Sequence, residues 1–374
     1  MNLSEFFLYV VLPLTTAVYW FLKKQFSYFE EKNIPFVKPS WIYGNLSGVN
    51  KSAHMSELLT KVYEECKEKD IVAGFYSSMS KIFVPTDLEV IKNITIKDFN
   101  IFPDRGVYSN EEDDPLTGHL FAIGGEKWRF LRHKLSPVFT SGKIKSMYHT
   151  ISDKGDNFVE AIEAESCSGS IEMKEISMRF TIDVISSCAF GLEANTLNHE
   201  HPEVLDVMRQ SDEDLRSIPY FLFLNAFPTL AKFLKLRQFR KSIDDFYVDV
   251  VGGNITNREE NNIVRNDFMN MLVQLKNKGS IDGETSTDSR KLTLKECVAQ
   301  GFVFMFAGAD TSSTTISYAI TELSLHPEIQ DKLRTEILDV SKGGELTYDN
   351  LHEMNYLNKV VNGKDSRVIF NDSP

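Results

Sequence analysis

The thirty-two residues Leu294–Leu325 constrain the fold more than any other part of the chain. Thr293 and Glu296 form a capping-box signature at the start of this run, and His326-Pro327 stops it. At about 1.5 Å per residue, a helix of this length reaches about 48 Å, enough to cross a whole domain. Because the run is nearly apolar on every side, we expect a buried central helix.

Polar residues interrupt the middle of this run, in the sequence AGADTSS that begins at Ala307. Gly308 allows close approach of another group, whereas Asp310 and Thr311 need hydrogen-bond partners if they are buried. We favour a functional interpretation, in which a widened helical turn holds water beside a flat cofactor. In the alternative interpretation, Thr311 bonds back to its own helix and Asp310 reaches solvent.

The N-terminal run Phe6–Leu22 has 17 uncharged residues, close to the minimum that spans a bilayer. Lys23 and Lys24 follow directly, so the positive-inside rule places the body of the protein in the cytosol. A cleaved signal peptide is the alternative, but the preceding MNLSE has no basic residue and no small-residue cleavage site follows. We therefore predict an uncleaved anchor.

Pro35 and Pro39 follow the anchor and predict an extended, stiff segment. This segment could hold the body at a set angle to the membrane, and a plain linker is the equal alternative. Beyond it the pattern is mostly helical. Two short strands are predicted at Ile71–Tyr76 and Lys81–Pro85, and a polar loop at Lys278–Lys291. The further predicted helices are Ser52–Lys69, Glu89–Ile94, Lys127–Leu135, Gly142–Glu165, Glu175–Phe190, His201–Asp212, Thr229–Val251, Asp267–Asn277 and Pro327–Val340.

Composition excludes several classes of protein. Hydrophobic residues make up 42% and charged residues 25% of the 374, so the chain is not disordered overall. The 41 Lys and Arg against 53 Asp and Glu give a net charge of −12, which argues against nucleic-acid binding. The four cysteines are widely spread without a CxxC pair, which excludes a disulfide scaffold and a paired-Cys zinc site. A reduced, cytosol-facing compartment fits this usage.

Three further segments carry chemical information. In Gly125–Phe139, Trp128 and Arg132 share one helical face and could bind a carboxylate or phosphate, although spacing alone favours an ordinary amphipathic helix. The aromatic segment Ser217–Leu236 could touch a membrane surface, line a substrate entrance or simply pack in the core. Arg179–Leu192 predicts a buried helix on which Cys188 is an inert thiol.

These segments, in this order, resemble a microsomal cytochrome P450 of the insect xenobiotic-metabolising type. The resemblance runs from Met1 to about Asn362, and its motifs are highly specific together and in register. They are DDPLTGHLFAIGGEKWRFLRHKLSPVFTSGKIK, RFTIDVISSCAFGL, AGADTSSTT and LHPEIQDKLRTEI. The resemblance implies a mainly α fold with a small β region. It divides the chain into an anchor (1–24), a Pro-containing hinge (25–45), a P450-like catalytic domain (46–362) and an unrelated tail (363–374).

The resemblance also implies roles for individual residues. Trp128 and Arg132 would hold a haem propionate, and Ala307 and Gly308 would lie against the haem. Asp310 and Thr311 would take part in proton delivery at an oxygen-activating bend. Substrate contacts are implied at Leu120, Phe121 and Phe304. A basic helix face would dock an acidic, NADPH-dependent reductase; it comprises Lys127, Arg129, His133 and Lys134.

The sequence departs from the family pattern near its end. The family's ExxR pair is expected directly after Asn362, and its haem-ligating Cys in a later FxxGxxxCxG loop, whereas the chain reads GKDSRVIFNDSP. Cys167 has Glu160 where that loop has Phe, and the ExxR at Glu213–Arg216 is in the wrong place. We therefore expect a fold incomplete at the C-terminus, no metal ligand in this chain, weak haem retention and no turnover. Read-through of a splice donor at Gly363-Lys364 and a truncated gene are equal hypotheses for the tail.

Two function classes follow. The first is a haem-dependent monooxygenase of the endoplasmic reticulum membrane that oxidises apolar small molecules with O₂ and reductase-supplied electrons. The second is a non-catalytic, membrane-anchored fragment that binds the reductase, or a truncated product without function. The sequence does not identify the substrate.

Overall fold

The computed structural model describes residues 2–41, 43–49, 52–167, 169–198, 202–282 and 290–363. The chain forms two compact units, each with its own contacts. Unit 1 comprises Met1–Tyr108 and Ser217–Leu236, and unit 2 comprises Ser109–Arg216 and Arg237–Pro374. The body predicted as one domain is therefore divided between two units. Of the predicted tail, residues 364–374 lie outside the described residues.

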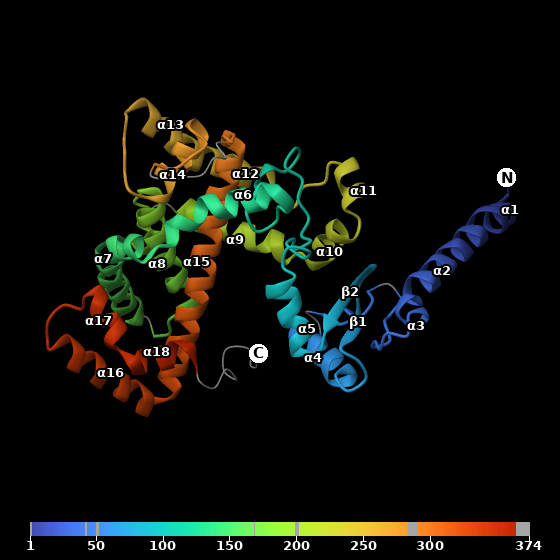
Figure 1. Ribbon diagram of the computed structural model, residues 1–374, viewed down its shortest axis with the longest axis horizontal. Helices are drawn as coiled ribbons and strands as arrows, with labels where there is room; N and C mark the ends of the chain where they lie inside the picture. Colours follow the sequence, from blue (N-terminus) through green and yellow to red (C-terminus); the bar gives the residue numbers. More distant parts are fainter. Residues whose placement is uncertain are drawn as a thin grey trace. The chain divides into compact units, whose positions relative to one another are not determined.

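Unit 1 contains the predicted strands and the N-terminal helices (Figure 1). The strands β1 (Val72–Ser77) and β2 (Ser80–Pro85) pair antiparallel, from Val72 opposite Pro85 to Ser77 opposite Ser80. The helices of this unit are α1 (Leu3–Phe6), α2 (Leu12–Phe26), α3 (Tyr28–Glu31), α4 (Met55–Cys66), α5 (Leu88–Lys92), α10 (Ile218–Ala226) and α11 (Pro228–Phe233), with π-helical turns at Phe7–Val11 and Asn93–Lys97.

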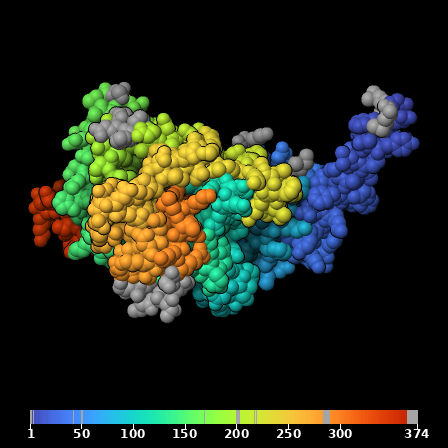
Figure 2. All heavy atoms as spheres, turned by 90° about the horizontal axis from the view of Figure 1, so that it is seen from above, coloured from blue at the N-terminus to red at the C-terminus, as the bar shows by residue number. Residues whose placement is uncertain are grey.

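The N-terminal helical run is long and apolar enough to cross a membrane. Ser4–Phe26 comprises 23 residues with a mean hydropathy of 1.6, and none of its apolar window is buried in the protein. Figure 2 shows it as a rod of blue spheres. The sequence therefore predicted both the helix and its apolar surface correctly, and the helix extends four residues beyond Leu22.

Residues 25–45 are not a plain linker, because they pack on the hairpin. Phe29, which α3 carries, is fully buried, and its ring lies 4.8 Å from that of Tyr76 on β1. Tyr76 Oη donates to Phe26 O at 3.0 Å and accepts from Phe29 N at 3.2 Å. Gln25 also donates to the carbonyl of Met79 at the hairpin turn. Residues 34–39, which were predicted to be extended, contain no helix, whereas Tyr28–Glu31 before them forms α3 with Phe29 buried.

Unit 2 is entirely helical in the residues that the structure describes. Its helices are α6 (Gly125–Leu135), α7 (Ser141–Ser166), α8 (Met173–Ile185), α9 (Pro202–Arg216), α12 (Lys241–Tyr247), α13 (Gly253–Glu260), α14 (Phe268–Asn277), α15 (Leu294–Leu325), α16 (Pro327–Ser341), α17 (Tyr348–Glu353) and α18 (Asn355–Asn362). Shorter 3₁₀ or π-helical turns lie at Pro115–Gly118, Ser136–Phe139, Ser186–Phe190, Thr196–Asn198 and Val248–Gly252.

Helix α15 is the central element of unit 2, and α8 lies along it (Figure 1). Its N-terminal half is buried. Gly301 is needed there because a Cβ atom would lie 2.6 Å from Val251 Cγ2. Phe302 packs its ring against those of Phe239 and Tyr247. The expectation of burial on every side is wrong for the C-terminal half, where one face of the helix is exposed.

The helix predicted at Thr229–Val251 is wrong as one element. Helix α11 ends at Phe233, and α12 begins only at Lys241. Lys235 adopts a left-handed conformation with φ of 53°, which ends a helix. Further on, the buried carboxylate of Asp114 accepts hydrogen bonds from the amides of Gln238 and Phe239, at 2.7 and 3.2 Å. These bonds hold the connection in a non-helical form.

The Tyr76 hydroxyl offers a test of how the anchor is attached. Tyr76→Phe keeps the ring but leaves the buried Phe29 amide without its acceptor, so we expect a loss of about 1–3 kcal/mol in the free energy of unfolding. Chemical unfolding in detergent micelles, followed by near-ultraviolet circular dichroism, measures this loss. Tyr63→Phe on the surface of α4 is the control. Equal stability of the two variants would contradict the hydrogen-bonded attachment.

Candidate functional site

The start of α15 is fixed by the predicted capping box. Glu296 N donates to Thr293 Oγ1 at 3.2 Å, and Thr293 N donates to Glu296 Oε2 at 2.8 Å. These bonds satisfy backbone donors that a helix start leaves free. The bounds of α15 are those predicted from the sequence. The helix remains α-helical from Leu294 to Leu325, so the widened turn expected near Gly308 is not formed.

Ala307 and Thr311 lie one turn apart on the exposed face of α15. Thr311 Oγ1 donates to Ala307 O at 2.7 Å, and Thr315 repeats this bond to Thr311 O at 2.9 Å. Each threonine therefore satisfies its hydroxyl proton within the helix, as the alternative interpretation stated. The hydroxyl oxygens keep lone pairs that can accept a proton or a hydrogen bond from a group placed on this face.

Gly308 and Asp310 are directed toward α8 rather than toward this exposed face. A Cβ atom on Gly308 would lie 3.2 Å from Ile185 Cδ1, so the glycine permits close packing of the two helices. Thr181 on α8 donates to Ala309 O at 2.9 Å. The residues of the AGADTSS sequence therefore lie on two sides of the helix. Gly308 and Asp310 lie on the side packed on α8, and Ala307 and Thr311 lie on the open side.

Lys174, near the start of α8, holds Asp310. Its Nζ lies 2.8 Å from Asp310 Oδ1 and 2.9 Å from Ser313 Oγ, and it also contacts the hydroxyl of Thr314. Asp310 therefore neither reaches solvent alone nor requires a widened turn. The ion pair is half-buried, which strengthens it relative to a pair in water. Sequence analysis missed Lys174, because no local pattern links residues so far apart.

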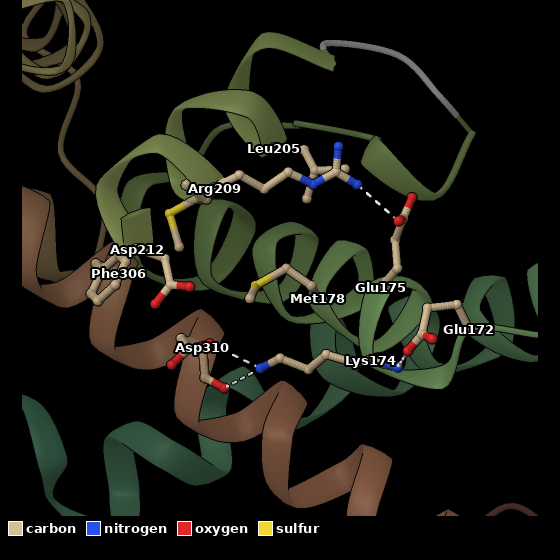
Figure 3. A pocket seen from close by; sticks show the side chains of 10 residues that line it. Glu172, Lys174, Glu175, Met178, Leu205, Arg209, Asp212, Phe306 and Asp310 are labelled. Atoms are coloured by element: carbon tan, nitrogen blue, oxygen red, sulfur yellow. Dashed lines mark hydrogen bonds and ion pairs between the residues drawn. The ribbon is translucent and has the colours of Figure 1, made fainter. Parts of the chain in front are cut away.

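The Lys174–Asp310 pair lies at one side of a pocket of about 270 Å³ between α8, α9 and α15 (Figure 3). Figure 3 shows Asp310 reaching Lys174 from α15, while Arg209 on α9 meets Glu175 on α8, at 2.8 Å. Glu172 and Asp212 add two further carboxylates to the lining, and its apolar part comes from Met178, Leu205, Met208 and Phe306. The Asp310 carboxylate therefore lies at a pocket with a charged rim, which is wide enough to admit water.

Helix α6 carries Trp128 and Arg132. The Trp128 side chain is half-buried and packs on the main hydrophobic core, whereas Arg132 is exposed. The exposed guanidinium keeps the capacity to bind a carboxylate in two parallel hydrogen bonds. These positions agree with an anion site that spans one turn of α6.

The predicted docking face on α6 needs correction at two lysines. Lys127 Nζ lies 2.7 Å from Glu296 Oε1 and also contacts Glu111, so these carboxylates neutralise it. Burial opposes ionisation of Glu296, but Lys127, the Thr293 amide and Arg290 lower its pKa. Lys134 is only 1% exposed, with its Nζ 5.5 Å from the centre of the Phe130 ring, because the helix turns this residue toward the core. A solvated basic face therefore cannot include Lys134.

The predicted substrate residues lie in different environments. Phe121 is 53% exposed, and Leu120 is half-buried. Phe304 is stacked on Phe268, at 3.8 Å between ring centres, and on Phe139 at 5.6 Å. The ring of Phe304 is therefore held in place by packing.

The loop before α6 is fastened to α15 by a buried glutamine. Gln300 Oε1 accepts from Leu120 N at 2.9 Å, and Gln300 Nε2 donates to Gly118 O at 3.1 Å. His119, between these two residues, is 8% exposed, and its burial lowers its pKa to about 4. Sequence analysis missed both side chains, since an isolated Gln or His gives no pattern.

Comparison with known proteins identifies the family. The sequence profile of the family Cytochrome P450 matches residues 34–362. The chain belongs to the cytochrome P450 family. It is 41% identical over 352 residues to Probable cytochrome P450 6a14 of Drosophila melanogaster, covering 90% of this chain and 69% of that relative. It is 37% identical over 367 residues to Cytochrome P450 6A1 of Musca domestica, covering 97% and 71%. The predicted resemblance is confirmed.

Membership in the P450 family implies a haem cofactor, and the residues present fit one side of it. A porphyrin needs an open surface and a cationic group for its propionates, which the Ala307–Thr311 face and Arg132 can supply. Burial raises the pKa of the half-buried Cys188 thiol to about 11 and that of the buried Cys297 thiol to about 12. Cys167 lies at the end of α7, where its Sγ donates to Glu163 O. Within the described part of the P450, no cluster of His, Cys, Asp or Glu could hold a metal ion.

Buried His119 makes the stability of this P450 dependent on pH. The unfolded chain takes up a proton near pH 6.5, whereas the folded protein does so only near its pKa of about 4. The stabilisation from neutral His119 is therefore complete above pH 6.5 and is lost as the pH falls toward 4. We expect His119→Gln to remove up to about 3 kcal/mol of this dependence. Urea unfolding at several pH values measures it, with the exposed His352→Gln as control. An unchanged pH profile in His119→Gln would refute this assignment.

Proposed function

We propose that the exposed face of α15 and the Arg132 face of α6 form the oxygen side of a haem site in a membrane-anchored monooxygenase. The family is a family of haem-dependent monooxygenases, and this proposal assigns its chemistry to particular residues. One observation carries it. The long apolar helix α15 presents Ala307 and Thr311 on an open face, while the adjacent Asp310 is held by Lys174 beside a water-accessible pocket.

Arg132 and Trp128 would hold the haem propionate. The guanidinium is exposed and always charged, so it pairs with a carboxylate at any physiological pH. The indole of Trp128 lies one turn earlier, which places its N–H donor on the same side. Packing of Trp128 on the core fixes the donor in place. When bound, the haem supplies the O₂ chemistry, and these residues supply orientation.

Asp310 and Thr311 would move protons to that face. The Thr311 hydroxyl lies on the open side of α15, and Asp310 lies on the side of the pocket. Lys174 holds the carboxylate within reach of the pocket. Asp310 would exchange protons with water in the pocket, and Thr311 would hold a proton by its hydroxyl on the open face.

Apolar small molecules are the proposed substrates. Phe121 and Leu120 present apolar surface from the loop that Gln300 fastens to α15. The stacked ring of Phe304 adds a fixed apolar wall. Contacts of this kind select for apolar character and shape and do not identify one compound.

An NADPH-dependent reductase is the proposed electron donor, and the endoplasmic reticulum membrane is the proposed location. Lys23 and Lys24 at the end of the apolar helix support a cytosolic body, because the positive-inside rule favours basic residues on that side. Arg129 and His133 are the other two residues of the proposed docking surface on α6. Lys127 is neutralised and Lys134 is buried, which counts equally against reductase docking through these lysines in the enzyme and in the non-catalytic alternative.

Haem binding by the 374-residue polypeptide tests the site. We expect Arg132→Gln to weaken haem retention by roughly tenfold, because a charge-assisted hydrogen bond to the propionate is lost. Absorbance titration with haem measures this retention, and Arg334→Gln on the exposed side of α16 is the control. Equal losses in the two variants would place the haem elsewhere.

The carbon monoxide spectrum of the same reduced samples reports the axial ligand. We propose that this polypeptide by itself gives no thiolate band, because none of its four cysteines lies in the FxxGxxxCxG pattern of the family's haem-ligating loop. A thiolate band would contradict this and would be traced by Cys→Ser variants. Absence of any haem binding would favour the non-catalytic alternative.

Thr311 and Thr315 form a matched pair for testing proton delivery, since both are exposed and both bond back to α15. In any polypeptide that carries these residues and turns over substrate, we expect Thr311→Ala to lower the product formed per NADPH by roughly tenfold or more. Thr315→Ala should leave this ratio near that of the parent. Product yield and hydrogen peroxide release are measured together. Equal effects of the two substitutions would exclude a special role for Thr311.

A further inference from the structure

A second pocket, of about 500 Å³, lies at the base of the anchor within unit 1. We propose that it binds an anionic glycerophospholipid of the membrane that α2 enters. Both the helix end and the following segment line it, and the lining residues are Tyr19, Leu22, Lys23, Phe26, Ser27, Glu30, Phe36, Lys38, Pro39 and Trp41. This volume is in the range of small-molecule pockets, large enough for a headgroup and the first part of an acyl chain.

The walls of this anchor pocket are held together by named contacts. Trp41 stacks on Tyr19 of α2, with ring centres 5.4 Å apart and an angle of 27° between the rings. On the opposite side, Tyr76 Oη donates to Phe26 O at 3.0 Å, and the two rings meet edge to face at 5.1 Å. The pocket therefore lies between α2 and the segment that follows it. Contacts with each other and with Tyr76 of the hairpin hold both walls in place.

The position of the pocket along α2 places it at the membrane surface. The candidate span ends at Phe26, and the pocket begins at Tyr19 and continues past that end. Trp41 is 56% exposed. Trp20, which follows Tyr19 in the sequence, is also exposed. Tyrosine and tryptophan favour the depth of lipid headgroups, where one side of the ring is apolar and the other is wet. A lipid can therefore enter this pocket from the side without leaving its leaflet.

The charges of the lining select an anionic headgroup. Lys23 and Lys38 contribute two positive charges and Glu30 one negative charge, so the lining carries 2 − 1 = +1. Both lysines are exposed, and the Lys23 ammonium lies 5.3 Å from the centre of the Trp20 ring, while Leu22, Phe26, Phe36 and Pro39 give the pocket apolar walls. A phosphate group matches the lysines and an acyl chain matches the walls, which is the chemistry of a phospholipid. A soluble anion would match only the lysines.

Such a lipid would contact both α2 and the segment that follows it, and it would fix the direction in which the body leaves the membrane. This consequence rests on the proposed placement of α2 in the membrane. The two proposals can fail separately. A chain that does not associate with vesicles at all would refute the membrane placement, whereas association without lipid selectivity would refute the pocket.

The test uses the full chain purified in detergent micelles and supplied with equal amounts of phosphatidylglycerol and phosphatidylcholine. Native mass spectrometry counts the lipids retained, and flotation with vesicles of phosphatidylcholine alone confirms membrane association. We expect phosphatidylglycerol to be retained preferentially. The double substitution Lys23→Gln with Lys38→Gln should reduce that preference roughly tenfold, since each lysine near the surface contributes to anionic lipid binding.

The matched control is Lys24→Gln with Lys32→Gln, which removes the same charge from exposed lysines that do not line the pocket. This control should keep the preference, and Glu30→Gln should increase it, because a negative charge is removed from the lining. Equal losses from the two double substitutions would show general surface attraction and overturn the proposal. Displacement of the lipid by glycerophosphoglycerol, which has no acyl chains, would also overturn it, because the site would then recognise only the headgroup.

Discussion

Close packing of α8 along α15 is the interaction on which unit 2 depends. Gly308 lets Ile185 approach α15, and the Thr181 hydroxyl donates to Ala309 O at 2.9 Å. The same packing brings the start of α8 to the polar centre of α15, where Lys174 meets Asp310. A larger residue at position 308 would require the Ile185 side chain to shift, since a Cβ atom there would lie 3.2 Å from Ile185 Cδ1. The packing of the domain and the electrostatics of its site are therefore set by one helix pair.

Helix positions could be predicted well from the sequence, because they follow from periodicity and capping. The bounds of α15 agree with those predicted, and α14 and α16 differ from their predicted bounds by one residue at one end. The failures have local physical causes. The left-handed Lys235 and the acceptor Asp114 end the predicted helix after α11, and neither can be recognised without knowing what packs beside the chain.

The candidate site could be predicted only in part. The polar cluster in α15 and the Trp128–Arg132 spacing drew attention to two segments that are helices in the structure, because unusual residues at helical spacing are visible in one sequence. The division of the cluster between two faces could not be predicted, since it depends on where α8 lies. Lys174 and Gln300 act across more than a hundred residues of sequence, so only the folded chain brings them to the site. The basic helix face was predicted from charge alone, and its partners Glu111 and Glu296 became visible only in the structure.

The division of the chain between the two units has a consequence for synthesis. Residues 217–236 belong to unit 1, although both of their flanking segments belong to unit 2. Within unit 1, the amide of Tyr108 donates to Asn225 Oδ1 at 2.8 Å, and the Tyr108 hydroxyl donates to Leu236 O at 3.0 Å. During translation, the anchor and hairpin leave the ribosome long before these partners do. Unit 1 therefore cannot form these hydrogen bonds until residues 109–216 of unit 2 have also been synthesised, and the last part of unit 2 is synthesised only after unit 1 is complete.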